Sequence, residues 1–314
     1  FDIENEYTSA LVSGSGTAAL EMAVSASVSS GRRILVIDNG IYGERIAKIA
    51  QRYDLKTKVL KFEWGSSPDL DQIDTTLKYD PEIEIVMIVH HETTTGLLNP
   101  VGAVAEITHR HGRRLLVDCI SSLGGDEFDF SLWRPDICVG TANKCFQGFP
   151  GVSFVLLRKD FLVDVNKIPP KSLYFDLSAH VKAQDCGNTL FTPAIQIHYA
   201  LDEALDELGE ETVAGRIDRY DKAAVFLRQG FQDMGLEFCL PLENYSNTLT
   251  SLKLPAGVTY SQLHDDLREN GFVIYAGQGE LSKNIFRVAN IGDIRMKEFK
   301  EFLQYLKSCI VTTA

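Results

Sequence analysis

An acid and a lysine in this sequence have the types and spacing that chemistry between amines and carbonyl groups requires. Asp118 directly follows the apolar run Leu115–Val117. Lys144 follows a second apolar run, Ile137–Val139, about one βα unit further along the chain. In an open α/β sheet such runs are parallel strands whose carboxyl ends meet at the ligand-binding edge. There a lysine can form a Schiff base with an aldehyde and an acid can pair with a protonated ring nitrogen, which predicts a site for pyridoxal 5'-phosphate (PLP).

A glycine-rich turn precedes the first predicted helix. The segment Ser13–Ala19 (SGSGTAA) follows an apolar strand end, and the hydroxyls of Ser15 and Thr17 lie beside amides that would open a helix. Such a helix N-terminus is a natural site for a phosphate group. The same glycine spacing fits a dinucleotide fingerprint, and Asp38 ends the next predicted strand where a ribose-binding acid would sit. A nicotinamide-dependent dehydrogenase is therefore an alternative on this segment, although it does not require the paired acid and lysine.

Two further predicted strand ends carry polar or aromatic groups. His91–Gly96 (HETTTG) follows the apolar run Ile85–Val89, and we expect the hydroxyl of Thr93 to bond the 3'-oxygen of the cofactor. The segment Asn39–Arg45 follows another apolar run, and its Tyr42 can stack on the pyridine ring because flat rings favour such contacts. Groups from four strand ends are thus predicted to meet at one edge of the sheet.

The composition is that of a folded, acidic protein of enzyme size. The chain has 314 residues, of which 45% are hydrophobic and 24% are charged, and its formal net charge is −12. A nucleic-acid or anionic-membrane partner would need a broad basic face, so neither is expected. No apolar run reaches the length of about 18 residues that a membrane span needs, and no signal peptide opens the sequence, so we expect a cytoplasmic protein. The six cysteines have no metal-ligand spacing, which predicts reduced thiols and no metal.

Short apolar runs alternate with amphipathic stretches from residue 9 to about 160, which predicts an α/β fold with a mostly parallel sheet between helices. We expect strands at Ala10–Val12, Ile34–Ile37, Val59–Phe62, Ile85–Val89, Leu115–Val117, Ile137–Val139 and Val152–Leu157. We expect helices at Ala18–Ala26, Glu44–Tyr53, Leu70–Leu77, Val101–His111 and Ala194–Leu208. The predicted large, cofactor-binding domain spans residues 1–215.

The last hundred residues predict a small α+β domain, residues 216–314. Its expected helices are Lys222–Met234, Ser261–Asn270 and Met296–Cys309. Its expected strands are Leu249–Leu254, Phe272–Tyr275 and Phe286–Val288.

Six segments resemble the class V aminotransferases, which have the fold type I of PLP enzymes. They are Ser13–Glu21, Asp38–Ile49, His91–Pro100, Val117–Gly125, Ala142–Gly151 and Phe286–Gly292. The combination of HETTTGLLNP with ANKCFQGFPG is the most specific part of this resemblance. It implies fold type I, PLP as the cofactor and a homodimer whose active site is shared across the interface.

The resemblance also implies roles for individual residues. It assigns Lys144 to the Schiff base, Asp118 to the pyridine nitrogen and Arg287 to the acidic group of the substrate. A guanidinium suits that last role because its planar fork binds carboxylate and phosphonate alike. It assigns the other contacts as follows: the phosphate to Ser15, Gly16, Thr17 and Asn143, the 3'-oxygen to Thr93, the ring faces to Tyr42 and Ile120, and the phosphate of the neighbouring subunit to Thr192.

The implied reaction is a ping-pong transfer between an amino donor and a 2-oxo acid acceptor. Within the family the sequence is most similar to members that act on 2-aminoethylphosphonate and pyruvate, which would give phosphonoacetaldehyde and alanine. An alanine or serine:glyoxylate aminotransferase would use the same residues and remains an alternative. Family members also begin with an N-terminal arm that this sequence lacks, so a PLP-binding dimer with little turnover is a further possibility.

Overall fold

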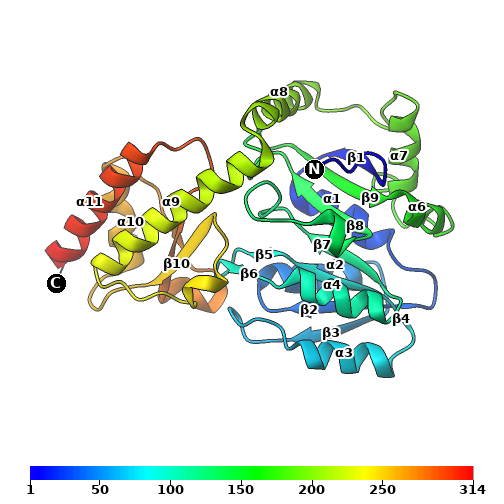
Figure 1. Cartoon of the computed structure of the whole chain (residues 1–314), viewed down its shortest axis with the longest axis horizontal. Coiled ribbons are helices and arrows are strands. Elements are labelled where there is room, and N and C mark those ends of the chain that lie inside the picture. Colours follow the sequence, from blue (N-terminus) through cyan, green and yellow to red (C-terminus); the bar gives the residue numbers. More distant parts are fainter. Residues whose placement is uncertain (314) are drawn as a thin grey trace.

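Seven strands form the central sheet of a large lobe, and a smaller lobe follows it in the sequence (Figure 1). The computed structural model describes residues 1–313. The strands of the sheet are β1 (Tyr7–Ser13), β2 (Arg33–Asp38), β3 (Thr57–Lys61), β4 (Ile83–Val89), β7 (Arg114–Asp118), β8 (Ile137–Thr141) and β9 (Val152–Arg158). Their order is β1-β9-β8-β7-β4-β2-β3.

All neighbouring strands of this sheet are parallel except where they pair with β9, which runs antiparallel to both β1 and β8. The predicted α/β class with a mostly parallel sheet is therefore confirmed. Strand β4 (IEIVMIV) is buried at all but one position, as expected for a parallel strand that is covered on both faces. Because β2, β4, β7 and β8 run in the same direction, the residues that follow them emerge at one edge of the sheet.

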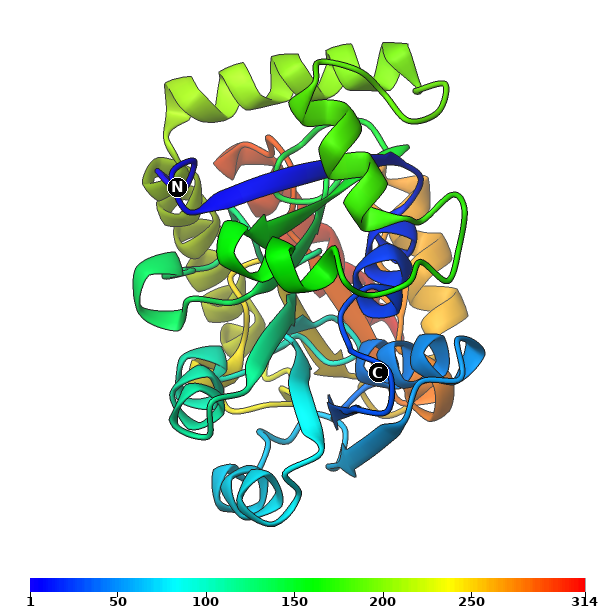
Figure 2. The same ribbon diagram turned by 90° about the vertical axis from the view of Figure 1, so that its right-hand side faces the viewer.

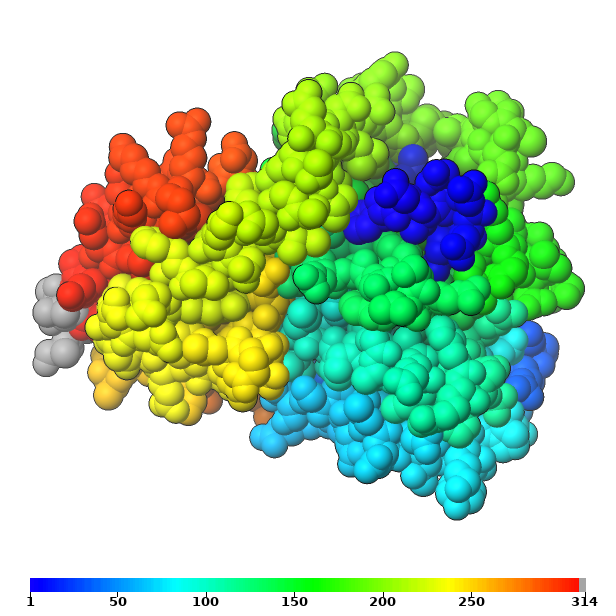
Figure 3. Space-filling view, in the orientation of Figure 1, coloured from blue at the N-terminus to red at the C-terminus, as the bar shows by residue number. Residues whose placement is uncertain are grey.

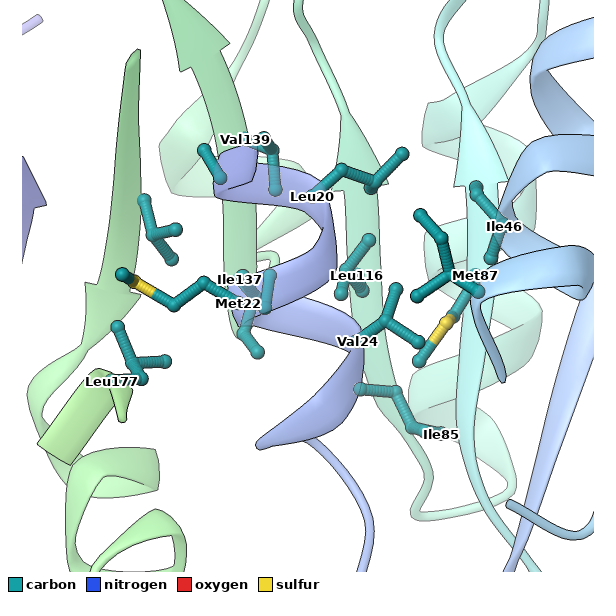
Figure 4. Close-up of a cluster of buried hydrophobic side chains, with 14 of the residues drawn as sticks. Leu20, Met22, Val24, Ile46, Ile85, Met87, Leu116, Ile137, Val139 and Leu177 are labelled. Atoms are coloured by element: carbon teal, nitrogen blue, oxygen red, sulfur yellow. The ribbon is translucent and has the colours of Figure 1, made fainter. Parts of the chain in front are cut away.

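Helices cover both faces of the sheet. They are α1 (Gly16–Ser25), α2 (Ile41–Arg52), α3 (Leu70–Tyr79), α4 (Val101–Arg110), α5 (Phe130–Trp133), α6 (Lys159–Val165), α7 (Leu177–Asp185) and α8 (Ile195–Glu211). Helices α1, α2, α6 and α7 share one buried apolar cluster with the sheet, and α3, α4, α5 and α8 contribute to the cluster on the opposite face. In the first cluster Leu20, Met22 and Val24 of α1 lie against apolar side chains of β4, β7 and β8 (Figure 4). The long helix α8 lies on the outside of the large lobe (Figure 2).

The small lobe has its own apolar core. Its elements are α9 (Val213–Asp233), β10 (Leu249–Lys253), α10 (Tyr260–Glu269), β11 (Tyr275–Ala276), β12 (Ile285–Ala289) and α11 (Met296–Thr313). The three strands form an antiparallel sheet in the order β10-β12-β11. The two lobes touch at a β-bridge between Leu97 and Tyr245. Figure 3 shows the small lobe, coloured from yellow to red, directly beside the large lobe.

Three features of the secondary structure differ from the predictions. Helix α9 begins at Val213 instead of Lys222, since the side chain of Thr212 caps it by accepting a hydrogen bond from the amide of Gly215 at 3.0 Å. The predicted strand Phe272–Tyr275 is wrong, because only its last residue enters the sheet, as part of β11. The short helices α5, α6 and α7 were not predicted. The predicted domain boundary after residue 215 falls in the first turn of α9, and it stays a prediction.

No helix within residues 1–313 combines the length and apolar character needed to cross a bilayer. Within the same residues no cluster of three or more His, Cys, Asp and Glu side chains could hold a metal ion.

Candidate active site

Asp118 is the last residue of β7, and its side chain lies in the interior at the carboxyl edge of the sheet. Its Oδ1 accepts a hydrogen bond from the amide of Ile120 at 3.0 Å. Its Oδ2 is buried, and no described residue donates a hydrogen bond to it. Burial raises the pKa of Asp118 to about 6, although the Ile120 amide and the charges of Arg45 and Lys144 act in the opposite direction. The arrangement leaves one buried carboxylate oxygen ready to accept a hydrogen bond from a cationic group.

Lys144 lies in a tight turn directly after β8, the strand next to β7. The turn is closed by hydrogen bonds from the amide of Gln147 to the carbonyl of Lys144 at 2.9 Å and from Gly148 to Ala142 at 2.8 Å. The thiol of Cys145 contacts the carbonyl of Ser121 at 3.5 Å, which joins this turn to the segment that follows Asp118. Because β7 and β8 are paired, Lys144 follows the strand beside that of Asp118, and its positive charge lowers the pKa of Asp118.

A buried histidine lies beside the lysine. The Nδ1 atom of His91 is 3.1 Å from the carbonyl of Ser121, and burial lowers the pKa of this imidazole to about 3, with Lys144 acting in the same direction. His91 is therefore neutral at physiological pH and does not compete as a cation for Asp118.

The N-terminus of α1 approaches the same edge. Ser15 is the N-cap residue in an extended conformation, and α1 begins at Gly16. A Cβ atom added to Gly16 would lie 2.7 Å from Cδ1 of Ile120, so the turn and the segment after Asp118 are in close contact. Thr17 accepts a hydrogen bond from the guanidinium of Arg45 at 3.3 Å. The first turn of α1 thus combines the backbone amides of a helix N-terminus with hydroxyl groups and a neighbouring cation, as an anion site requires.

The small lobe contributes Arg287 to this region. Its Nη1 donates a hydrogen bond to the carbonyl of Thr93 at 2.7 Å, and its Nε donates one to the carbonyl of Ala276 at 2.9 Å. Burial lowers the pKa of Arg287, while Tyr42 and other neighbouring groups raise it. The hydrogen bond from Arg287 on β12 to Thr93, in the segment after β4, therefore joins the two lobes. It brings the guanidinium of Arg287 to the region of the site.

Tyr42 lies in the first turn of α2, with the guanidinium carbon of Arg45 4.6 Å from the centre of its ring. Ile120 is half-buried and packs against the large core beside α1. Both side chains belong to segments that follow strands of the same edge, as predicted.

Two predicted residues lie apart from the buried groups. Asn143 is exposed, and its Oδ1 accepts a hydrogen bond from the hydroxyl of Thr141 at 2.8 Å. Thr192 is also exposed and precedes α8, near Ser13, whose Oγ accepts a hydrogen bond from the amide of Ala194 at 3.1 Å. Their predicted contacts with a phosphate stay predictions.

Two residues of the site were not singled out from the sequence. Arg45 lies near Asp118, Thr17 and Tyr42. Glu92 is fully buried beside Asp118. A signal for Glu92 was present, because an acid three residues after a long apolar strand needs a partner when it is buried.

Comparisons with known proteins agree with this arrangement. A mostly parallel sheet that carries a buried acid, a lysine and an anion-binding helix N-terminus at one edge is the architecture of an aminotransferase. The chain matches the aminotransferase class-V family over residues 2–283, and it belongs to that family.

The chain is also similar to individual members. It is 35% identical over 312 residues to 2-aminoethylphosphonate--pyruvate transaminase of Vibrio cholerae, which covers 98% of this chain and 84% of the relative. Its fold matches the crystal structure of alanine--glyoxylate aminotransferase from Nostoc sp. with a TM-score of 0.90 and 27% identity, over 96% of this chain and 81% of the other. It matches pyridoxamine-pyruvate aminotransferase from Mesorhizobium loti equally well, with a TM-score of 0.90 and 25% identity over 97% and 79% of the two chains. The alternative of a nicotinamide-dependent dehydrogenase is therefore set aside.

Proposed function

We propose that this enzyme uses PLP to transfer the amino group of 2-aminoethylphosphonate to pyruvate, giving phosphonoacetaldehyde and alanine. The observation that carries the cofactor assignment is the unpartnered, buried Oδ2 of Asp118 on the strand next to that of Lys144. The substrate assignment is supported by the Vibrio cholerae relative, whose similarity extends over nearly the whole chain.

The residues present fit PLP. Asp118 would pair with the protonated pyridine nitrogen, because a buried carboxylate without a donor is costly unless a cation meets it. Lys144 would hold the aldehyde carbon. Tyr42 and Ile120 would contact the two ring faces. The groups proposed for the phosphate are Ser15, Gly16, Thr17 and Asn143, and the hydroxyl of Thr93 would bond the 3'-oxygen. When bound, PLP supplies an electron sink for the carbon that loses its proton.

Three side chains of the protein would have separate roles in the reaction. The amine of Lys144 would carry the proton between the substrate's α-carbon and the cofactor's 4'-carbon, acting first as base and then as acid. Asp118 would keep the proton on the ring nitrogen throughout both half-reactions. Arg287 would bind the acidic group of the donor and later that of pyruvate, so that each reacting carbon lies beside the same lysine.

An alanine or serine:glyoxylate aminotransferase is the second candidate. The match to the Nostoc alanine--glyoxylate enzyme favours it, and one arginine fork accepts a carboxylate as well as a phosphonate. The two candidates differ only in the donor and acceptor.

We also propose that the enzyme is a cytoplasmic homodimer in which Thr192 of one subunit contacts the cofactor phosphate of the other. The exposed position of Thr192 supports this, because within its own chain the side chain is open to solvent. Sedimentation of the holoenzyme would measure the subunit number, and a monomeric holoenzyme would contradict the shared site.

The proposed function is tested with purified protein that has been loaded with PLP. Borohydride reduction followed by peptide mass analysis should find the cofactor attached to Lys144. A panel of donors, 2-aminoethylphosphonate, alanine and serine, should then be supplied with pyruvate and with glyoxylate. We expect the highest kcat/KM for 2-aminoethylphosphonate with pyruvate. Preference for alanine or serine with glyoxylate would establish the second candidate instead, and absence of bound PLP would reject both.

A further inference from the structure

Glu92 occupies a position that the proposed reaction does not use. It is completely buried, three residues after the end of β4, in the two-residue strand β5 (His91–Glu92). A buried carboxylate is retained in a fold only where hydrogen bonds or charges compensate the loss of water. Its partners therefore indicate what it does.

The carboxylate caps the N-terminus of α2 from a different part of the chain. Its Oε2 accepts hydrogen bonds from the amides of Tyr42 and Gly43, both at 3.2 Å. Its Oε1 accepts hydrogen bonds from the amide of Thr94 at 3.2 Å and from the hydroxyl of Thr94 at 2.5 Å. That hydroxyl in turn accepts a hydrogen bond from the amide of Ile41 at 3.0 Å. Glu92 and Thr94 together therefore bind the first three amides of α2, which would otherwise lack partners.

The helix cannot supply this cap itself. Its N-cap residue is Gly40, which has no side chain to accept a hydrogen bond. A Cβ atom at Gly40 would collide with the side chain of Glu92, so the glycine makes room for the carboxylate. An anion at this place also interacts favourably with the positive end of the helix dipole.

The residue that this cap fixes is Tyr42, because Glu92 bonds its backbone amide directly. The next residue along β5 and its loop, Thr93, accepts the hydrogen bond from Arg287 through its carbonyl. The negative charge of Asp118 also raises the pKa of Glu92, in addition to the larger effect of burial. One buried side chain is thus attached to the proposed ring-stacking residue and adjoins the two groups proposed for the ring nitrogen and the substrate.

We propose that Glu92 is a positioning residue that holds Tyr42 against the cofactor ring by capping α2 in concert with Thr94. This inference rests on the proposed binding of PLP. It makes a specific claim about how Glu92 acts: its contribution to cofactor affinity passes through the aromatic ring of Tyr42.

The chain offers well-matched variants. Glu92→Gln preserves the size of the side chain but leaves a single acceptor oxygen. That oxygen can accept hydrogen bonds from the α2 amides or from Thr94, but not from both. The side-chain NH2 group of the glutamine then faces the donors on the other side. Thr94→Val removes the cap on Ile41 without changing any charge. Glu44→Gln is the control, because Glu44 lies in the first turn of the same helix but is bonded to Lys48 at the surface, at 2.8 Å.

The test is a double-mutant cycle on the dissociation constant of PLP, measured by titration of the apoenzyme, with each variant made in the wild-type and in the Tyr42→Ala background. We expect Glu92→Gln and Thr94→Val each to raise the dissociation constant about tenfold in the wild-type background, as the loss of roughly one charge-assisted hydrogen bond would. In the Tyr42→Ala background the same changes should alter it by less than about twofold, since the ring that the cap positions is absent. Glu44→Gln should leave the constant unchanged in both backgrounds.

Three results would overturn the inference. An equal loss of affinity in both backgrounds would mean that Glu92 supports the fold in general and does not act through Tyr42. No loss in the wild-type background, with normal PLP binding by the unmodified enzyme, would mean that the cap has no role in the site. Failure of the unmodified enzyme to bind PLP would reject the proposed function, and the inference with it. If Glu92→Gln does not fold, Thr94→Val alone decides between these outcomes.

Discussion

At the scale of single residues, the site contains ionisable groups whose pKa values are shifted by burial. Burial raises the pKa of Asp118 to about 6 and that of Glu92 to about 7, while it lowers the pKa of Arg287. Shifts of this kind concentrate at functional sites, because a bound ligand replaces the water that each group lost. In the proposed complex, the protonated ring nitrogen of PLP would supply the cation that Asp118 lacks. The acidic group of the substrate would supply an anion for Arg287.

Replacing Asp118 by Asn should abolish most of the turnover. The substitution keeps the size of the side chain but removes the charge that holds a proton on the ring nitrogen, so the electron sink is weakened. We expect kcat to fall about a thousandfold or more, equivalent to roughly 4 kcal/mol of barrier. The measurement is single-turnover kinetics on enzyme whose PLP content has been verified by borohydride labelling, with the exposed Asp71→Asn as the control. Near-normal turnover by a fully loaded variant would remove Asp118 from the site.

Replacing Arg287 by Ala tests the class of substrate. A phosphonate carries more charge near neutral pH than a carboxylate, so the loss of its arginine partner should cost more. We expect kcat/KM for 2-aminoethylphosphonate to fall roughly a hundredfold, equivalent to about 3 kcal/mol of lost transition-state stabilisation. The value for alanine should fall less. Arg295→Ala, an exposed arginine of the same lobe, should behave as wild type. Equal kinetics of Arg287→Ala and wild type for all donors would show that this arginine does not bind substrate.

The raised pKa of Glu92 predicts a pH dependence of stability. In the fold its pKa is about 7, above the ordinary value of 4.5, so between these values the folded protein binds more protons than the unfolded chain. The contribution of Glu92 to the free energy of unfolding is therefore complete below about pH 4.5 and is lost as the pH rises through 7. Denaturant unfolding of the apoenzyme should show wild type losing more stability than Glu92→Gln between pH 5 and 8. Parallel pH profiles for the two proteins would mean that Glu92 titrates normally.

At the scale of elements, the first turns of α1 and α2 face the same edge of the sheet and lack side-chain caps of their own. The N-cap residues Ser15 and Gly40 make no side-chain hydrogen bond to their helices. For α2 the cap comes from Glu92 and Thr94, whereas the first turn of α1 is left for an anion. This difference supports the proposals that the cap of α2 positions Tyr42 and that the first turn of α1 binds a phosphate.

A close contact in α1 should be sensitive to a single methyl group. Gly16→Ala places a Cβ 2.7 Å from Cδ1 of Ile120, so Ile120 must move from the position proposed for the ring face. We expect weaker PLP binding, by about tenfold, with little loss of unfolding free energy, because the isoleucine tip can shift. The control is Gly209→Ala in the last turn of α8, where a Cβ has no neighbour within 4 Å, so alanine should leave both the dissociation constant and the free energy of unfolding without a loss. An unchanged dissociation constant in Gly16→Ala would contradict the proposed place of the cofactor.

At the scale of the whole molecule, the site depends on how the two lobes meet. The hydroxyl of Ser246 donates a hydrogen bond to the buried Asp126 at 2.7 Å, and the amide of Asn247 donates another at 2.7 Å. The hydroxyl of Ser251 donates to the carbonyl of Thr95 at 2.5 Å. These bonds hold the small lobe against the segments that follow β7 and β4, and because Ser251 pairs with Arg287 across β10 and β12 they also fix the strand that carries Arg287.

Removing the acceptor at this junction should affect substrate more than cofactor. In Asp126→Ala the Ser246 hydroxyl and the Asn247 amide lose their buried acceptor, which should lower the free energy of unfolding by about 1–3 kcal/mol. KM for the donor should rise, because Arg287 belongs to the displaced lobe, whereas the dissociation constant of PLP should change little. Steady-state kinetics and PLP titration of this variant, with the exposed Glu127→Ala as the control, separate the two effects. A larger loss of PLP affinity than of substrate affinity would contradict this account of the junction.

The sequence by itself determined the sheet and the residues at its carboxyl edge. Uninterrupted apolar runs identified the parallel strands, because strands buried on both faces have no alternation, and parallel strands bring their following residues to one edge. That argument was sufficient to place Asp118 and Lys144 at the carboxyl ends of two strands at one edge of the sheet, and the structure shows that these strands are neighbours. It did not find α7 or the true start of α9, although Asp176 and Thr212 are N-cap residues of preferred types, because the apolar residues of these two helices have weak helical periodicity.

Only the tertiary structure decided which side chains act together. The cap of α2 by Glu92 joins residues 50 positions apart, and the bond from Arg287 to Thr93 joins residues 194 positions apart in different lobes. No local pattern encodes such pairs, because the spacing along the chain between two buried polar groups says nothing about the distance between them in space. These pairs form because a buried donor or acceptor without a partner is costly. The partners come within reach only when the whole chain has folded.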